Sequence, residues 1–346
     1  MRRRPVLLIL RALGLGDVLT AVPALRALAR WFPEHRRLLA CPGTLAPLLG
    51  LVSLGAGRPA VHELVDASPL QALPATLTQV AVAVNLHGRG PQSHRLLLAL
   101  APERLVAFAH PDVPESRDGP RWLAGEHEVR RWCRMLQASG IDCDSGALEI
   151  ERPALAETWL PERALGATLL HPGAASQARR WPVERWAAVA RAQGDAGRAV
   201  ILTGSAGEVA LAEEVASRAG LRRDSVLAGR TGLRELAAAV GAAGRVVCGD
   251  TGVGHLATAL GTPSVVLFGP VPPHEWGPPA TDHHRVLWKG RRGDPHGGRP
   301  DHGLLQIAVD DVLAELHLLE RSCAPRGAEQ RALSRAGDAG RAPARR

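Results

Sequence analysis

The sequence of 346 residues contains no tyrosine and three phenylalanines, and aromatic side chains make up only 3% of it. It has no helix-turn-helix, no zinc-finger pattern and no interleaved aromatic and basic motif of the kind that binds RNA. Its apolar runs also fall short of the roughly 18 residues that a membrane-spanning helix needs. We therefore expect neither a nucleic-acid partner nor a transmembrane segment.

Cysteine is scarce and scattered. The number of cysteines is odd and no two form a CxxC pair, which is typical of buried or incidental thiols in a reducing compartment. They are Cys41, Cys133, Cys143, Cys248 and Cys323. The histidines and aspartates of residues 289–303 also lack the spacing of metal ligands. We therefore predict no metal site, and we predict a flexible loop over residues 289–303.

The net charge of +8 comes almost entirely from arginine, since Lys289 is the only lysine. Much of this charge lies in residues 2–4 and in the tail beyond Leu319, and a basic surface attracts anionic lipid. The apolar run of residues 6–10 is too short for a signal peptide. The sequence thus favours a cytoplasmic protein, with contact to the inner membrane face left open. Residues 321–346 are predicted to be disordered.

Short apolar runs alternate with helical patterns along the rest of the chain. The runs at residues 6–10, 38–40 and 80–86 and those at 167–170, 199–202, 246–248 and 264–268 are continuous, as in parallel strands buried on both faces. The length suffices for two full cores. We predict an α/β protein of two Rossmann-like domains facing a cleft, residues 1–150 and 151–320.

The turn at Asp250, Thr251 and Gly252 follows one of these strands and opens a helix. Free backbone N–H groups and the positive end of the helix dipole meet there, so the turn can seat a phosphate. His255 lies one helical turn after Thr251, on the same face. The alternative is that Asp250 or Thr251 only caps the helix and that His255 is a packed core histidine.

A second such turn, containing Gly14, Gly16 and Asp17, follows the first strand. Open α/β sheets bind ligands at this edge. Residue 19 is a leucine where the dinucleotide fingerprint requires a third glycine, so an NAD site is not expected. The Asp17 carboxylate could take a proton from an acceptor hydroxyl, or it could cap the following helix.

The strand at residues 80–86 leads into a segment with His87, Arg89 and Ser93. The guanidinium of Arg89 could hold an anionic acceptor. The alternative is that this is a glycine-rich surface loop. Further on, residues 127–136 read as an amphipathic helix whose arginines, Arg131 among them, form a solvated face.

Four segments together resemble glycosyltransferase family 9, the ADP-heptose:lipopolysaccharide heptosyltransferases and their relatives. One is the run DTGVGHLATALGTPSVVLFGP that begins at Asp250, and another is the run LGDVLTAVPALRAL that contains Asp17. The third is HPGA followed by RRWP, in which Arg179 stands where the family has lysine. The fourth places Glu208 as the acid of a G-x-x-x-E pattern. The resemblance extends over most of residues 5–320.

This resemblance implies a GT-B architecture and an inverting, metal-independent transfer of a heptose-like sugar. The donor would be a nucleotide-diphosphate sugar linked to ADP, bound as a substrate with no cofactor, and the acceptor a hydroxyl of a cell-envelope or other glycan. Asp17 would be the catalytic base. The donor-binding residues would be Ser176, Arg179, Glu208, Asp250, Thr251, Gly252 and His255, and the acceptor-binding residues Gly16, His87, Arg89 and Ser93.

Two other functions remain open on the sequence. A sugar-nucleotide epimerase or a phosphorylase could use the same two-domain cleft. A non-catalytic protein that only binds nucleotides could also use it, although binding alone does not require a carboxylate at Asp17.

Overall fold

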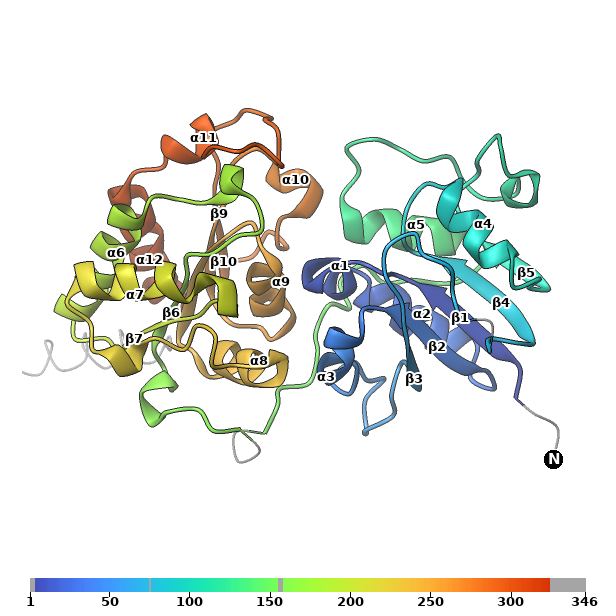
Figure 1. The fold of residues 1–346 in the computed structure, drawn as a ribbon, viewed down its shortest axis with the longest axis horizontal. Helices are drawn as coiled ribbons and strands as arrows, with labels where there is room; N and C mark the ends of the chain where they lie inside the picture. Colours follow the sequence, from blue (N-terminus) through green and yellow to red (C-terminus); the bar gives the residue numbers. More distant parts are fainter. Residues whose placement is uncertain (1–3, 75, 155–157, 324–346) are drawn as a thin grey trace, which may run out of the picture.

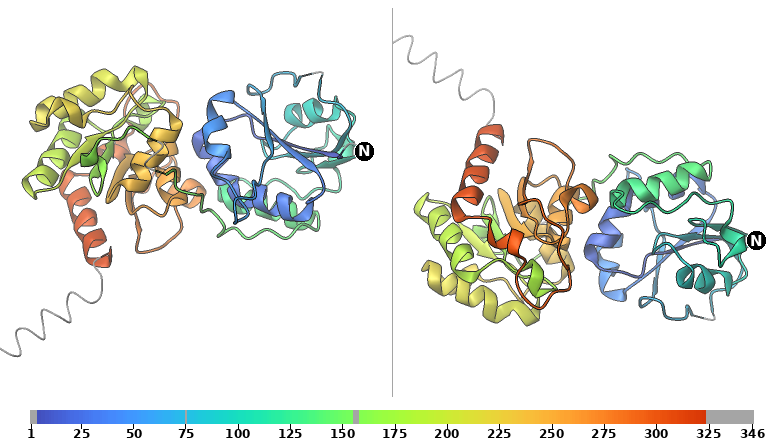
Figure 2. Two further views of the ribbon diagram at one scale, coloured as in Figure 1. Left: turned by 90° about the horizontal axis from the view of Figure 1, so that it is seen from below. Right: turned by 90° about the horizontal axis from the view of Figure 1, so that it is seen from above.

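The chain folds into two lobes that lie side by side, as a computed structural model describing residues 4–74, 76–154 and 158–323 shows (Figures 1 and 2). Each lobe contains a five-stranded parallel sheet flanked by helices. This arrangement confirms the predicted α/β fold with two Rossmann-like domains. The basic termini, residues 1–3 and 324–346, lie outside the described residues.

The first sheet has the strand order β3-β2-β1-β4-β5, and all its strands are parallel. The central strand β1 is buried along its whole length, as its unbroken run of apolar residues predicts. The strands are β1 Val6–Leu10, β2 Arg36–Cys41, β3 Glu63–Asp66, β4 Val80–Asn85 and β5 Arg104–Val106, and the helices are α1 Leu15–Thr20, α2 Val22–Trp31, α3 Ala46–Leu49, α4 Gln92–Leu98 and α5 Glu128–Ala138.

The second sheet repeats this design with the order β10-β9-β8-β6-β7. Its last helix, α12, packs against α6 and against β9 and β10. The strands are β6 Thr168–His171, β7 Val200–Leu202, β8 Arg245–Gly249, β9 Ser264–Leu267 and β10 His284–Leu287, and the helices are α6 Val183–Asp195, α7 Val209–Ala219, α8 Leu233–Ala242, α9 Gly252–Ala259, α10 Pro273–Trp276, α11 His302–Leu305 and α12 Val309–Cys323. None of the helices in the described ranges is both long and apolar enough to cross a membrane.

Several predicted elements differ from the observed ones. The apolar spacing after the first strand predicts one helix from about Val18 to Trp31. The helix instead begins at Leu15 and is divided at Ala21, which ends α1 and begins α2, and Pro23 stands in the first turn of α2. Helix α12 continues to Cys323, so the prediction of disorder from residue 321 is wrong for its first three residues. The edge strands β3 and β10 were not predicted, because their charged and polar residues interrupt the apolar pattern.

The two domains meet mainly through helices α1 and α9, with smaller contacts between α3 and α8 and between α5 and α10, and through the segment that crosses between the sheets near residue 150. In that segment the Ile150 N–H donates to the carbonyl of Ala259 (2.8 Å). The predicted boundary between residues 150 and 151 falls here. At the helix contact, a Cβ atom added to Gly252 would lie 2.9 Å from the Cβ of Leu15. The absence of a side chain at Gly252 therefore allows α1 and α9 to approach closely.

We expect Gly252→Ala to lower the free energy of unfolding by about 1–3 kcal/mol, because the new methyl group overlaps Leu15. The control is Gly194→Ala in α6, where an added Cβ meets no atom within 4 Å. That change should raise the stability by about 0.5–1 kcal/mol, since alanine favours a helix. Urea unfolding of both variants measures the two changes, and an unaltered Gly252→Ala stability would contradict the tight contact.

Candidate active site

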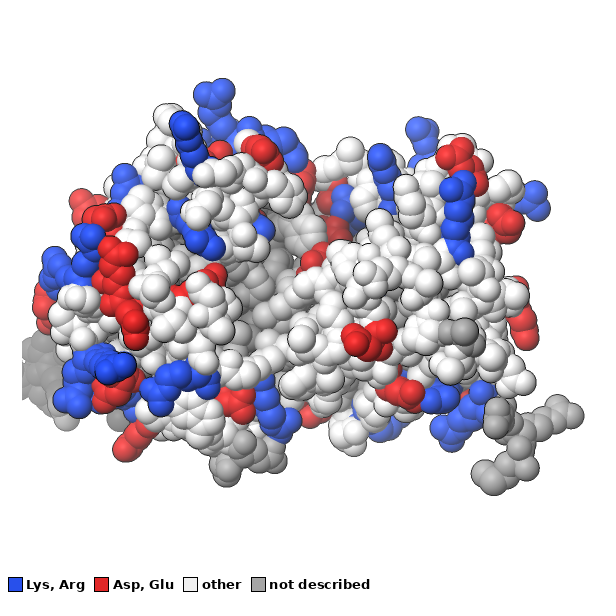
Figure 3. Space-filling model, in the orientation of Figure 1, with Lys and Arg blue, Asp and Glu red and all other residues white. Residues whose placement is uncertain are grey.

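A cavity of about 640 Å³ lies between the domains, at the carboxyl ends of both sheets. The molecular surface is hollowed between the lobes (Figure 3). We call this space the donor cavity. Eight of the predicted donor-binding, acceptor-binding and catalytic residues line it: Gly16, Asp17, Arg179, Glu208, Asp250, Thr251, Gly252 and His255. The fold thus brings the turns of the two domains to one place.

Asp17 occupies the first turn of α1. One carboxylate oxygen accepts a hydrogen bond from the Gly14 N–H (3.2 Å), and the other lies 3.2 Å from Nη2 of Arg11. Burial raises the pKa of Asp17, Arg11 opposes this shift, and the negative charge of Glu128 adds to it. The carboxylate is still 27% exposed. Asp17 therefore caps its helix and also presents a carboxylate of raised proton affinity to the cavity.

The carboxylate of Asp17 is paired with Arg11, a residue that the sequence did not indicate as part of the site. Its side chain is only 1% exposed, and its Nη2 lies 2.9 Å from Oε1 of Glu128 at the start of α5. Glu128 also accepts a hydrogen bond from the indole of Trp132 (3.0 Å). The one signal for Arg11 in the sequence is a charged residue directly after a buried strand. Glu128 gave no signal, because 117 residues separate the two partners.

The prediction that the arginines of helix α5 form a solvated face is wrong for Arg131. This side chain is buried, pairs with Glu128 and lies with its guanidinium 4.1 Å from the ring centre of Trp122. The pattern of charges along the helix could not reveal this, because the acidic and aromatic partners cover a face that would otherwise meet solvent.

The opposite wall of the donor cavity joins a cation to a helix N-terminus. Thr251 is the N-cap residue of α9, and Asp250 precedes it. Arg179 donates from Nη1 to the backbone carbonyl of Asp250 (3.2 Å), and the same nitrogen lies 3.9 Å from the Asp250 carboxylate. Burial raises the pKa of Asp250 to about 6, and Arg179 only partly opposes the shift. The guanidinium of Arg179 therefore has capacity for a stronger anionic partner.

Glu208 also lines the donor cavity from the second domain. Its carboxylate accepts hydrogen bonds from the N–H and the hydroxyl of Ser205, both 2.8 Å long. Burial acts to raise the pKa of Glu208, but these two bonds and the nearby His171 outweigh it and lower the pKa. A Cβ added to Gly173 would lie 2.1 Å from the carboxylate. Gly173 is thus required for an ionised Glu208 to stand where it does.

His255 lines the donor cavity and is not enclosed in a core. Its ring meets that of Trp276 edge to face, with 6.0 Å between the ring centres. Burial lowers the pKa of His255 to about 4, and the nearby His127 and the Arg11 guanidinium add to the effect. The imidazole is therefore neutral at pH 7, and each of its nitrogens can serve as donor or acceptor according to the tautomer.

Four predicted residues do not line the donor cavity. The hydroxyl of Ser176 accepts from the Ala178 N–H (3.2 Å) and donates to the Gly297 carbonyl (3.3 Å). Ser93 is buried, and its hydroxyl accepts from the amide of Asn85 (2.8 Å).

The other two, His87 and Arg89, follow strand β4 in the first domain. His87 is half-buried and burial lowers its pKa, whereas Arg89 is exposed. The acceptor roles of these residues and the donor role of Ser176 stay predictions.

The segment 289–303 contributes two residues that the sequence did not indicate. Pro295 and His296 line the donor cavity. The segment is fixed to the second domain where Gly293 donates to the Pro270 carbonyl (2.9 Å) and Ala178 donates to that of Gly297 (3.1 Å). No group of three or more histidines, cysteines or acids suited to a metal occurs among the residues that the structure describes.

Comparison with known proteins places the chain beside heptosyltransferases. The family model for glycosyltransferase family 9 (heptosyltransferase) matches residues 121–301, just over half of the chain. Lipopolysaccharide heptosyltransferase 2 of Salmonella typhimurium is 29% identical over 231 residues, which cover 64% of this chain. The match spans only 60% of the length of that relative.

Two solved structures share the fold. A family 9 glycosyltransferase from Veillonella parvula superposes with a TM-score of 0.72 at 19% identity, covering 92% of this chain and 97% of the other. The ADP-heptose lipopolysaccharide heptosyltransferase II of Escherichia coli superposes with a TM-score of 0.69 at 21% identity. The match covers 92% of this chain and 100% of the other. The two-domain arrangement is thus the GT-B type, as the sequence predicts.

We expect Asp250→Asn to stabilise the protein at neutral pH. Because the folded-state pKa of Asp250 is raised to about 6, folding favours its protonated form, and this contribution is lost as the pH rises through 6. The free energy of unfolding of the variant should therefore equal that of the wild type near pH 4 and exceed it by about 1–3 kcal/mol at pH 8. Denaturant unfolding at both pH values tests this, with exposed Asp118→Asn as a control that should show no such divergence.

Proposed function

The chain belongs to glycosyltransferase family 9, and from this premise we propose that it is an inverting glycosyltransferase that uses a nucleotide-diphosphate sugar. One observation carries the proposal: Asp17 from the first domain and Arg179 with the start of α9 from the second line a single cavity. We favour a heptose-like sugar and ADP as the nucleotide, in keeping with the ADP-heptose enzyme of Escherichia coli. The acceptor would be a hydroxyl of a cell-envelope or other glycan.

The donor's diphosphate would lie between Arg179 and the N-terminus of α9. Negative charge grows on the diphosphate as the sugar leaves, and fixed positive groups stabilise it most when they are already in place. Arg179 is held by the Asp250 carbonyl before any ligand arrives. With the charge supplied in this way, we propose a reaction that needs neither a metal ion nor a cofactor.

Asp17 would act as the general base. The acceptor oxygen forms a bond to the anomeric carbon while its proton passes to the Asp17 carboxylate. The bond from the anomeric carbon to the diphosphate oxygen breaks, and its electron pair leaves with the diphosphate. Because acceptor and leaving group lie on opposite faces of the sugar, the configuration inverts. The raised pKa of Asp17 makes it a stronger base than an ordinary carboxylate.

The remaining residues would position the substrates. Ionised Glu208 would accept hydrogen bonds from the ribose hydroxyls, and neutral His255 would contact the sugar or its phosphates. On the acceptor side we retain Gly16, His87, Arg89 and Ser93. Contact with the inner membrane face would depend on the basic termini.

A binding and transfer assay tests this function. Calorimetry with ADP, UDP and GDP should reveal one preferred diphosphate. Arg179→Gln should weaken its binding about tenfold or more, since a charge-assisted contact is lost. The control Arg299→Gln removes an exposed arginine that does not line the donor cavity and should bind normally.

Asp17→Asn should retain this binding but lower transfer from the ADP sugar by about 10²–10⁴-fold. Undiminished transfer would remove Asp17 from the mechanism. A new sugar or sugar phosphate formed without acceptor would favour the epimerase or the phosphorylase. Binding without turnover of any kind would favour the non-catalytic alternative.

The pH profile offers a second, independent test. Transfer requires ionised Asp17, so kcat/KM should fall as the pH drops through its raised pKa. Glu128→Gln removes a negative charge that contributes to the raised pKa, so the acid limb should move to lower pH. Glu126→Gln is the matched control, because Glu126 pairs with Arg134 and not with Arg11. An acid limb that stays in place or moves upward in Glu128→Gln would contradict this coupling.

A further inference from the structure

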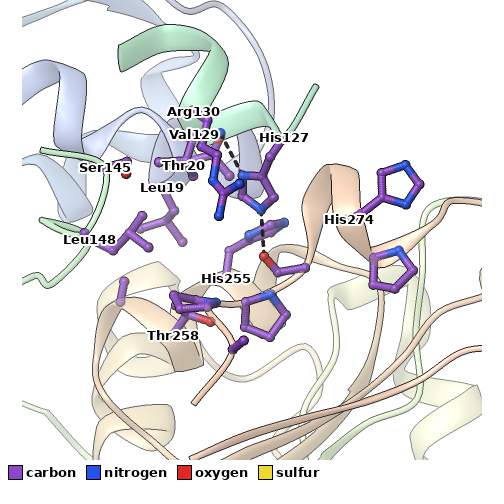
Figure 4. A pocket seen from close by; sticks show the side chains of 17 residues that line it. Leu19, Thr20, His127, Val129, Arg130, Ser145, Leu148, His255, Thr258 and His274 are labelled. Atoms are coloured by element: carbon purple, nitrogen blue, oxygen red, sulfur yellow. Dashed lines mark hydrogen bonds between the residues drawn. The ribbon is translucent and has the colours of Figure 1, made fainter. Parts of the chain in front are cut away.

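A second cavity, of about 370 Å³, lies on the other side of the α1–α9 contact. It is enclosed by the end of α1, the start of α5, residues 145–148, α9 and residues 273–280 (Figure 4). His255 lines both cavities, but Asp17 and Arg179 do not line the second one. The second cavity is therefore a compartment separate from the donor cavity, and we call it the interdomain pocket.

The walls of the interdomain pocket are largely apolar. Its volume is near the lower end of the range for small-molecule sites, about 300–1,000 Å³. Such a space holds a ring system or a short chain and is too small for a two-chain lipid. The apolar lining includes Leu19, Val129, Leu148, Ala259 and three prolines, Pro273, Pro278 and Pro279.

The charge of the pocket has one sign. No aspartate or glutamate is among its lining residues in the described part of the chain, whereas Arg130 is. Arg130 is exposed, and its guanidinium has no ion-pair or hydrogen-bond partner within the described ranges. Arg130 and His127 stand on one side of this space, and His255 and Thr258 on the other (Figure 4). Arg130 is thus a cation available to a ligand.

The histidine beside Arg130 is already engaged. Nδ1 of His127 accepts from the Val129 N–H (3.3 Å), and Nε2 lies 3.0 Å from the Gly277 carbonyl. Both ring nitrogens therefore have partners within the protein, and the bond to Gly277 joins α5 to the second domain. The anionic part of a ligand would therefore meet Arg130 and not His127.

From these observations we propose that the interdomain pocket binds a small anion with an apolar body. The ring or short chain lies against Leu19, Leu148 and Ala259, and the acidic group pairs with Arg130. Because the walls come from both domains, the ligand contacts both at once. The proposal depends on this geometry and not on the sugar-transfer reaction.

Two fluorescent probes test the proposal. One is 8-anilinonaphthalene-1-sulfonate, and the other is N-phenyl-1-naphthylamine, which has the same aromatic body without the sulfonate. The sulfonate should bind at one saturable site and more tightly than the neutral amine. Arg130→Glu should weaken sulfonate binding about tenfold, since attraction becomes repulsion, and leave amine binding nearly unchanged. Arg117→Glu, an exposed arginine outside the pocket, is the matched control.

Two further variants locate the probes. Leu148→Glu places a carboxylate among apolar walls and should weaken the binding of both probes. Arg179→Gln in the donor cavity should weaken the binding of neither. Circular dichroism melts check folding, and if Leu148→Glu is unfolded the exposed Arg130→Glu decides alone. Equal sulfonate binding by Arg130→Glu and wild type, an equal loss in Arg117→Glu, or a loss in Arg179→Gln would each overturn the proposal.

Discussion

The close contact between α1 and α9 is the constraint on which the site depends. Each helix begins at the carboxyl end of a strand, so its first turn carries the polar residues of its own domain. Gly16 lies against His255, and Gly252 lies against Leu15, with too little space for a side chain on either glycine. Only because these turns meet do a carboxylate from one sheet and a cation from the other share one cavity.

The charges on the two walls are held in opposite ways. In the first domain, Asp17 shares buried Arg11 with Glu128, so the cation is divided between two carboxylates and cannot fully stabilise either. In the second, Nη1 of Arg179 lies 3.9 Å from the carboxylate of the buried Asp250, so the positive charge of Arg179 is only partly neutralised. The cavity thus has a basic carboxylate on one side and an incompletely paired cation on the other. A substrate that brings a hydroxyl proton and a phosphate would relieve both.

The local parts of this design can be predicted from the sequence. Asp17, Asp250 and His255 follow directly from strand ends, because a strand–turn–helix unit fixes which residues reach the sheet edge. Glu128 and His296 cannot be predicted in this way, since their places depend on packing between segments far apart in the chain. The sequence also could not tell that Ser93 and Ser176 use their hydroxyls on their own domain, because a hydroxyl's partner is decided by tertiary contacts.

His255 connects the two cavities physically. Its imidazole is kept neutral by burial and by the nearby guanidinium of Arg11. A charged histidine in this wall would add a cation to the apolar pocket and to the donor cavity at once. With a neutral imidazole, Arg130 supplies the fixed charge of the interdomain pocket, and the donor cavity keeps the charges of its own acids and Arg179. His255 thus adds no charge at neutral pH to either of the two cavities that it lines beside the α1–α9 contact.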